Sequence, residues 1–228
     1  MKVYFHYCPQ GFSNCYILGT DYNPDEAAAS QETKVLKKKT TARREAVPPR
    51  EALIIDPGNM DAEILKIIEN NAYRLRGILI THDHPHHVQG LKTITRIYGT
   101  KIYAINPVIR ELRTTLVRDG EMLKIGSFYI EVISVPGHSA DSAVYKTGRL
   151  LFTGDALSAG LVGRTASSYA ATTQATALRS KILSLPGDYS ILPGHGPPTC
   201  LDAERRYNLG LNTHEQQKVR RPAVRFES

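Results

Sequence analysis

The sequence predicts an α/β fold in which two sheets are covered by helices. Three observations predict it. Short apolar runs typical of strands recur along the chain, these runs come in clusters, and segments with the spacing of amphipathic helices separate some of them. No internal sequence repeat stands out. We therefore expect one domain that spans residues 1–228, with an insertion at about residues 21–50.

The first half of the chain begins with a predicted hairpin. Residues 2–7 alternate as a strand does, and a Pro-Gln-Gly turn leads into a second strand at residues 14–19. A polar stretch rich in alanine and lysine follows, ends in Pro48-Pro49, and is expected to be a long loop or a partly helical excursion. The predicted elements after it are a strand at 52–56, a helix at 61–70, a strand at 77–81, a helix at 88–98 and a strand at 101–105.

The second half is richer in predicted strands. Turn residues bound most of its apolar runs, which are short enough to be strands. The predicted elements are strands at 128–135, 142–147 and 150–153, a helix at 173–185, a strand at 190–192 and a last helix from about Leu201.

The formal net charge of +7 is concentrated in two segments. Residues 32–51 hold seven basic and three acidic side chains, and residues 204–228 hold six basic and three acidic ones, so the rest of the chain is neutral. A solvated charge run is the favoured interpretation of both segments. The alternative is an electrostatic surface for an anionic partner, which keeps nucleic acid open as a less favoured partner beside a small-molecule substrate.

Membrane and disulfide chemistry are not expected. No apolar run approaches the roughly 20 residues that span a bilayer, and the N-terminus lacks the apolar core of a signal peptide, so we expect a cytoplasmic protein. The three cysteines, Cys8, Cys15 and Cys200, form no C-x-x-C pair and are interpreted as reduced thiols. Two of them adjoin or enter apolar strand-like runs, where a small hydrophobe is favoured over a reactive nucleophile.

Four of the eight histidines lie in one seven-residue segment, Thr81-His82-Asp83-His84-Pro85-His86-His87, at the end of a predicted strand. Each neutral imidazole has two polar nitrogens to satisfy, which makes this segment a poor core and a good metal site. His82 and His84 are two residues apart on an extended segment, so they project to the same side and can converge on one ion. His87 begins the next helix and can reach a second ion.

Three further polar residues share the context of this loop. His138, Asp155 and His195 each follow an apolar run and lie in or beside a glycine-containing turn. A lone Pro-Gly-His turn is a weak signal. Together, however, the three place ligand-type side chains at the ends of successive strands, where open α/β architectures build their sites.

The ordered set resembles the metallo-β-lactamase superfamily, whose signature is His-x-His-x-Asp-His followed by a single His, a bridging Asp and a final His. Other motifs resemble the small glyoxalase II-like hydrolases, and the resemblance covers nearly the whole chain except the insertion. These motifs are Asn14-Cys15-Tyr16, Ile55-Asp56-Pro57-Gly58, Pro136-Gly137-His138-Ser139, Phe152-Thr153-Gly154-Asp155, Gly163-Arg164-Thr165 and the run from Pro193 to Thr199 followed by Glu204-Arg205.

The resemblance implies an αββα sandwich of two mixed sheets flanked by helices, with two divalent metal ions. It assigns His82, His84 and His138 to the first ion, His87 and His195 to the second, and Asp155 to both. It also implies that Asp56 orients a metal-bound imidazole, although a turn-capping role for Asp56 is equally open. Zinc is the expected metal, with iron or manganese as alternatives.

His86 departs from the family's pattern, because the family has an aspartate ligand of the second metal at this position. Replacing a carboxylate with a neutral imidazole would raise the charge of the centre by about one unit and weaken the second site. Three interpretations stay open: His86 binds the second ion, it points away and leaves one ion, or the site is inactive. Asp83 cannot replace the missing aspartate. If Asp83 and His84 formed the Asp-His pair of the signature, its first histidine would have to lie at position 79, which is Leu79.

The expected function is hydrolysis of an ester-like bond, first of all a thioester, by a metal-bound hydroxide. His82, His84 and Asp155, with Asp56 behind them, are the residues expected to carry the reaction. Only 33 residues follow His195, so the helical domain with which glyoxalase II grips glutathione is expected to be absent or replaced. The alternatives are a phosphodiesterase or ribonuclease of the same fold, a mononuclear iron persulfide dioxygenase and a non-catalytic metal-binding protein. The oligomeric state is left open.

Overall fold

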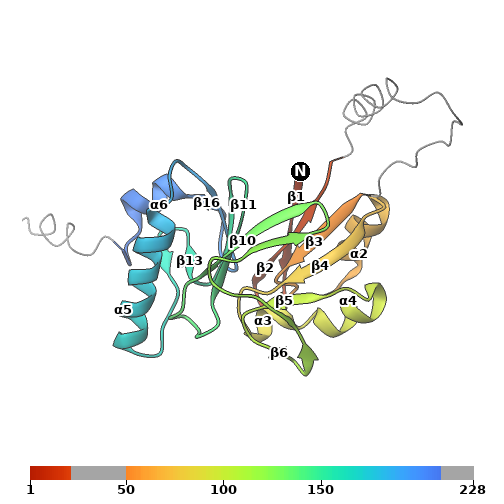
Figure 1. Ribbon diagram of the computed structural model, residues 1–228, viewed down its shortest axis with the longest axis horizontal. Helices are drawn as coiled ribbons and strands as arrows, with labels where there is room; N and C mark the ends of the chain where they lie inside the picture. The colour runs from red at the N-terminus through yellow and green to blue at the C-terminus, as the bar shows by residue number, and fades with distance from the viewer. Residues whose placement is uncertain (22–49, 212–228) are drawn as a thin grey trace, which may run out of the picture.

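The computed structural model describes residues 1–21 and 50–211 (Figure 1). Most of the basic insertion expected at 21–50 and the basic tail beyond residue 211 lie outside the described residues. Within the described ranges, every helix is too short or too polar to cross a membrane.

The first sheet has six strands in the order β1-β2-β3-β4-β5-β8. Strands β1 to β3 are antiparallel neighbours, and β3, β4, β5 and β8 run parallel to one another. The bounds of its strands are β1 Lys2–Cys8, β2 Ser13–Gly19, β3 Glu51–Ile55, β4 Arg74–Leu79, β5 Ile102–Ala104 and β8 Thr115–Leu116. The predicted hairpin at residues 2–19 is therefore confirmed, with Phe5 paired to Tyr16.

The second sheet also has six strands, in the order β16-β15-β12-β11-β10-β9. Strands β9 to β12 form an antiparallel meander, β12 and β15 are parallel, and β16 pairs antiparallel with β15. Their bounds are β9 Met122–Ile125, β10 Phe128–Ser134, β11 Ala143–Thr147, β12 Leu150–Gly154, β15 Ser190–Pro193 and β16 Thr199–Cys200. Two small hairpins complete the strands, β6 Val108–Ile109 with β7 Leu112–Arg113 and β13 Leu157–Ser158 with β14 Leu161–Val162.

Helices cover the outer face of each sheet, which gives four layers (Figure 1). The helices are α2 Ala62–Asn70, α3 Pro85–Val88, α4 Leu91–Tyr98, α5 Ser168–Ala177 and α6 Leu201–Tyr207, and α5 continues into a π-helical segment, η1 Leu178–Leu183. One apolar cluster joins α2 and α4 to the first sheet, a second fills the space between the sheets, and a third joins α5, η1 and α6 to the second sheet. Burial of these three apolar layers drives the αββα arrangement, which confirms the predicted fold class.

Two predicted helices have different bounds in the structure. The helix predicted at 88–98 is divided into α3 and α4, because Gly90 lies against the backbone of Pro57 and Asn59. An added Cβ at Gly90 would lie 2.5 Å from the Asn59 carbonyl oxygen, so the close approach requires glycine. The helix predicted at 173–185 begins earlier, at α5, because the Ser167 hydroxyl caps it by accepting a hydrogen bond from the Ala170 amide.

Two of the three cysteines are buried in the first apolar cluster. Cys8 and Cys15 are 1% and 0% exposed, and Cys200 is partly exposed. All three are free thiols, as expected. Burial raises the pKa of Cys8 and Cys15, so both stay protonated and act as small hydrophobes.

Candidate metal centre

The expected ligands follow the carboxyl ends of strands from both sheets. His82 comes three residues after β4, Asp155 directly after β12 and His195 two residues after β15. Because β12 and β15 are parallel neighbours, with Gly154 paired to Pro193, Asp155 and His195 leave the second sheet side by side. A hydrogen bond from the Ala143 amide to the Thr81 carbonyl then holds the histidine loop of the first sheet against the second.

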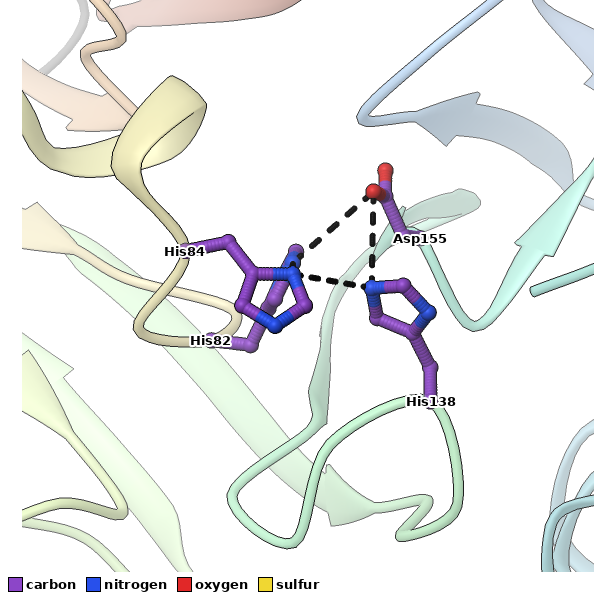
Figure 2. A group of neighbouring side chains, drawn as sticks. All are labelled: His82, His84, His138 and Asp155. Atoms are coloured by element: carbon purple, nitrogen blue, oxygen red, sulfur yellow. Dashed lines mark hydrogen bonds and ion pairs between the residues drawn. The ribbon is translucent and has the colours of Figure 1, made fainter. Parts of the chain in front are cut away.

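One group of four side chains could hold a metal ion: His82, His84, His138 and Asp155 (Figure 2). Nδ1 of His84 lies 3.0 Å from Nε2 of His82 and 3.1 Å from Nε2 of His138. Oδ2 of Asp155 lies 3.8 Å from Nε2 of His82 and 3.6 Å from Nε2 of His138. Ligand atoms of a tetrahedral zinc ion are about 3.3 Å apart, given bonds of about 2.0 Å. The group therefore has the spacing of a metal site.

The first group also has the protonation state that a metal requires. Burial and the neighbouring charge of His87 lower the pKa of His82 to about 2, and burial and His138 lower the pKa of His84. Both rings are therefore neutral near pH 7 and offer lone pairs. A cation placed among the converging nitrogens of His82, His84 and His138 would have three ligand atoms at the spacing of a metal site.

A second group consists of His87, Asp155 and His195. Oδ1 of Asp155 lies 2.7 Å from Nδ1 of His195, and Oδ2 lies 3.5 Å from Nε2 of His87. His87 is fully buried, and neither of its ring nitrogens has a hydrogen-bond partner of good geometry in the described structure. A metal ion at Nε2 would give that nitrogen a partner, while Nδ1 lies 3.2 Å from Oδ2 of Asp56. Asp155 belongs to both groups.

Strong electrostatic coupling joins the residues of the second group. Burial by itself would lower the pKa of His87, but the carboxylates of Asp155 and Asp56 outweigh it and raise the pKa to about 10. Burial would likewise raise the pKa of Asp155, but His195 and His87 hold it well below its ordinary value. The hydrogen bond to Asp155 raises the pKa of His195. Without a metal, protons on His87 and His195 therefore balance the buried carboxylates.

Asp56 lies directly behind His87 and Thr81. Its Oδ2 is 3.2 Å from Nδ1 of His87, and its two oxygens accept hydrogen bonds from the amide and the hydroxyl of Thr81, at 2.8 and 2.6 Å. The Thr81 hydroxyl lies 3.0 Å from Nδ1 of His82. Asp56 thus contacts His87 directly and His82 through Thr81, an arrangement that leaves both Nε2 atoms to face Asp155. Sequence reasoning missed Thr81, and its position directly before His82 was the only signal.

Backbone carbonyls orient the other two imidazoles. Nδ1 of His138 lies 2.8 Å from the Arg164 carbonyl, and Nε2 of His195 lies 3.2 Å from the Gly11 carbonyl. An N–H at each of these atoms donates to the carbonyl. The opposite nitrogens, Nε2 of His138 and Nδ1 of His195, then face the Asp155 carboxylate, at 3.6 and 2.7 Å. Sequence reasoning did not assign these two carbonyls a role, because any residue type can supply one.

Glycines beside the ligands leave no room for a side chain. A Cβ at Gly194 would lie 2.5 Å from Cε1 of His87 and 2.6 Å from Oδ1 of Asp155. Gly154 has a φ of +50°, and a Cβ there would overlap the Thr81 side chain. The glycine turns noted in the sequence therefore let the two sheets approach closely enough to form one site.

His86 lies apart from the two groups. Its side chain is exposed, and its ring centroid is 6.0 Å from that of His195. Its backbone is held by the Ser13 hydroxyl, which donates to the His86 carbonyl at 2.6 Å, and its Cβ packs on Gly11. The structure thus brings together Asp56 and six of the seven residues predicted to bind metal, and it places His86 at their edge, against the turn between β1 and β2.

Comparison with known proteins agrees with this geometry. The chain is 29% identical over 190 residues to the hydroxyacylglutathione hydrolase GloC of Haemophilus influenzae, covering 72% of this chain and 89% of that protein. It is 31% identical over 186 residues to the probable metallo-hydrolase YqgX of Bacillus subtilis, covering 71% and 88%. The crystal structure of TTHA1623 in a di-iron-bound form is 26% identical, covers 69% of this chain and 88% of its own, and superimposes with a TM-score of 0.60.

Residues 46–195 match the family model of the metallo-beta-lactamase superfamily, a range that runs from just before β3 to the last histidine of the site. The matched range holds both ligand groups and Asp56. Together with the αββα layers, this match shows that the chain belongs to the metallo-beta-lactamase superfamily, whose members are mostly metal-dependent hydrolases.

Proposed function

We propose that this protein is a metal-dependent hydrolase of ester-like bonds, with thioesters as its first substrate class. The observation that carries the proposal is the position of Asp155, whose carboxylate belongs to two ligand groups at once. A carboxylate shared between two groups is the arrangement expected when two ions lie side by side. The likeness to a hydroxyacylglutathione hydrolase supports the thioester as the substrate class.

The residues present fit two ions. His82, His84 and His138 would hold the first, His87 and His195 the second, and Asp155 would contact both. Imidazole-rich groups of this kind suit zinc or iron, and the likeness to a di-iron protein keeps iron open beside zinc. When bound, such ions polarise a carbonyl oxygen and make a water molecule at the centre acidic enough to attack near pH 7.

The chain's own residues set the geometry and the proton positions. Asp56 fixes the ring of His87, and Thr81 does the same for His82. The Arg164 carbonyl keeps a proton on Nδ1 of His138, so its Nε2 stays directed at Asp155. His82 and His87 are 1% and 0% exposed, so bulk water is excluded from their side of the centre. In a preorganised site from which water is partly excluded, electrostatic interactions with the negative charge that develops in the transition state are stronger.

The two buried cysteines are not positioned to act as nucleophiles at this site. Cys8 and Cys15 lie in the apolar cluster beneath the first sheet, and burial keeps both thiols protonated. The side chains that converge at the end of the sandwich are imidazoles and carboxylates. We therefore propose attack by water rather than a covalent acyl-enzyme.

A substrate panel tests the proposal. Protein loaded with zinc or with iron(II) is given S-acyl thioesters, lactones and phosphodiesters, and thiol release is followed with a chromogenic disulfide. We expect thioester turnover that falls by about 100-fold or more in Asp155→Ala, since both ligand groups lose a member. Lys66→Ala, an exposed change on α2, is the matched control and should keep full activity.

Other outcomes would contradict the proposal. Turnover of phosphodiesters alone would indicate a nuclease-type member of the superfamily. Oxygen uptake by the iron-loaded protein without hydrolysis would indicate an oxygenase. If none of the three substrate classes is turned over with either metal, the site serves metal binding without this chemistry.

A further inference from the structure

A cavity lies at the end of the sandwich opposite the metal centre. It occupies about 480 Å³ between the start of β4, the end of α4, the start of β5 and the turn between β9 and β10. The histidine loop follows the other end of β4, so the length of that strand separates the cavity from the metal centre. Four cationic side chains line it: Arg74, Arg76, Lys101 and Lys124.

A β-bulge helps to build this cavity. Ala52 on β3 pairs with Leu75, but the next residue, Leu53, pairs with Gly77, so Arg76 is the extra residue. A bulge redirects side chains relative to a regular strand, and Cγ of Arg76 lies toward Gly126, in the β9–β10 turn of the second sheet. Gly77 leaves room for the ring of Tyr103, because a Cβ there would lie 2.8 Å from it.

The positive charge of the cavity is largely unmatched. Glu51 pairs with Arg76, with 3.2 Å between Oε1 and Nε, while its other oxygen accepts hydrogen bonds from Ser127. Within residues 1–21 and 50–211, no ion pair involves Arg74, Lys101 or Lys124, and the ammonium of Lys124 lies 5.5 Å from the ring of Tyr129. Among the described residues, the walls of the cavity therefore hold an excess of positive charge.

Polar and aromatic groups complete the wall. The hydroxyl oxygen of Thr100, a residue that lines the cavity, is buried without a hydrogen-bond partner in the described structure. The hydroxyl of Tyr98 donates to Glu69 at 3.0 Å, which fixes that ring at the cavity, and Tyr103 lines it as well. Guanidinium and ammonium groups beside aromatic rings are a common setting for phosphorylated ligands.

We propose that this cavity binds a small anion that carries two or more phosphate groups and is about the size of a nucleotide. Its volume lies within the range of small-molecule sites, roughly 300–1,000 Å³. The cations come from three segments, since Arg74 and Arg76 lie on β4, Lys101 directly before β5 and Lys124 on β9, so they can contact several phosphate oxygens at once. The site is independent of the proposed hydrolase activity, because it shares no residue with the metal centre.

Calorimetric titration of the metal-loaded full chain tests the proposal. The probes are inorganic tripolyphosphate, ATP and a 20-nucleotide single-stranded RNA, and the variants are Arg74→Ala, Lys101→Ala and their combination. We expect saturable binding of tripolyphosphate or ATP that weakens at least tenfold in the double variant and falls with added salt. Equal affinity for tripolyphosphate and ATP would show that the phosphates alone are recognised. Tighter binding of ATP would show that the tyrosines of the cavity also contact the nucleoside.

The control variant is Lys66→Ala, which removes the same charge from an exposed position on α2 outside the cavity and should leave binding unchanged. If the melting temperature of the double variant falls, Lys124→Ala serves in its place, because this cavity residue is exposed and its ammonium makes no ion pair within the described residues. Three results would overturn the proposal. The first is that neither tripolyphosphate nor ATP binds. The second is that binding persists in the cavity variants but is lost in Asp155→Ala, and the third is that only the RNA binds.

Discussion

Oδ1 of Asp155 lies 2.7 Å from Nδ1 of His195, while the other oxygen of the same carboxylate faces the imidazoles of His82, His87 and His138 at 3.5 to 3.8 Å. One partly buried carboxylate thus lies beside histidines that follow strands of both sheets. Asp155 joins the group of His82, His84 and His138 to the group of His87 and His195, so its loss should affect both.

Asp155→Asn keeps the shape of the side chain and removes its charge. We expect metal affinity to fall by on the order of 100-fold or more at both sites, since an amide is a poor ligand beside imidazoles. Competition with a fluorescent chelator measures this loss. His195→Ala is the comparison, because it should weaken the second site while leaving the first close to wild type. Equal losses at both sites in His195→Ala would contradict the division into two groups.

His86→Ala tests whether the unusual histidine is needed. The ring of His86 is exposed and lies outside both ligand groups, so we expect the metal content of His86→Ala to equal that of the wild type. Elemental analysis after dialysis against micromolar zinc gives the answer, with His87→Ala as the positive control for loss of the second ion. Loss of one ion in His86→Ala would show that the ring turns inward when metal binds.

Metal binding should release protons. The carboxylates of Asp155 and Asp56 outweigh burial and raise the pKa of His87 to about 10, so its imidazole is protonated at pH 8 in the metal-free protein. A ligating imidazole must be neutral, so the second ion displaces that proton, and its affinity should rise with pH up to about pH 10. His82, with a pKa of about 2, contributes no proton. Calorimetry in buffers of different ionisation enthalpy counts the protons, and a count of zero at pH 8 would contradict the assignment.

Asp61 makes a separate contribution to stability at the start of α2. Its Oδ1 accepts hydrogen bonds from the amides of Glu63 and Ile64, at 3.0 and 3.1 Å, and its Oδ2 lies 2.8 Å from Nε2 of His6. Burial would raise the pKa of Asp61, but the Ile64 amide and His6 outweigh it and lower the pKa. A carboxyl with a lowered folded-state pKa stabilises the fold above its unfolded pKa of about 3.9, and this stabilisation is lost as the pH falls through the folded-state value.

Asp61→Ala should therefore lower the free energy of unfolding by about 1 kcal/mol at pH 7. Asp61→Asn keeps a capping oxygen and should lose only the part that depends on charge. Urea unfolding of the metal-free protein between pH 7 and pH 3 measures both variants. The difference between the aspartate and asparagine proteins should shrink toward pH 3, and a constant difference would refute the role of charge.

The layers and the candidate ligands could be predicted from the sequence because both depend on side-chain type. Apolar runs indicated most long strands, and the imidazoles of His82, His84 and His138 predicted a metal site whose proposed ligands the structure brings together. Features set by the backbone were not predictable. Gly90 divides a helix through a contact with a distant loop, the Gly11 and Arg164 carbonyls orient histidines, and the cavity around Arg74 depends on a bulge that no residue pattern marks. Short strands such as β6 and β13 have too few residues to show a period.

The number of metal ions bound per chain tests the central claim most directly. Native mass spectrometry of the full chain, after loading with zinc or iron(II) and removal of excess metal, gives this number together with elemental analysis. We predict two ions per wild-type chain and a reduced number in His87→Ala, since His87 belongs only to the second of the two groups that share Asp155. A wild-type chain that binds no ion, or binds one ion that His87→Ala does not affect, would contradict the account.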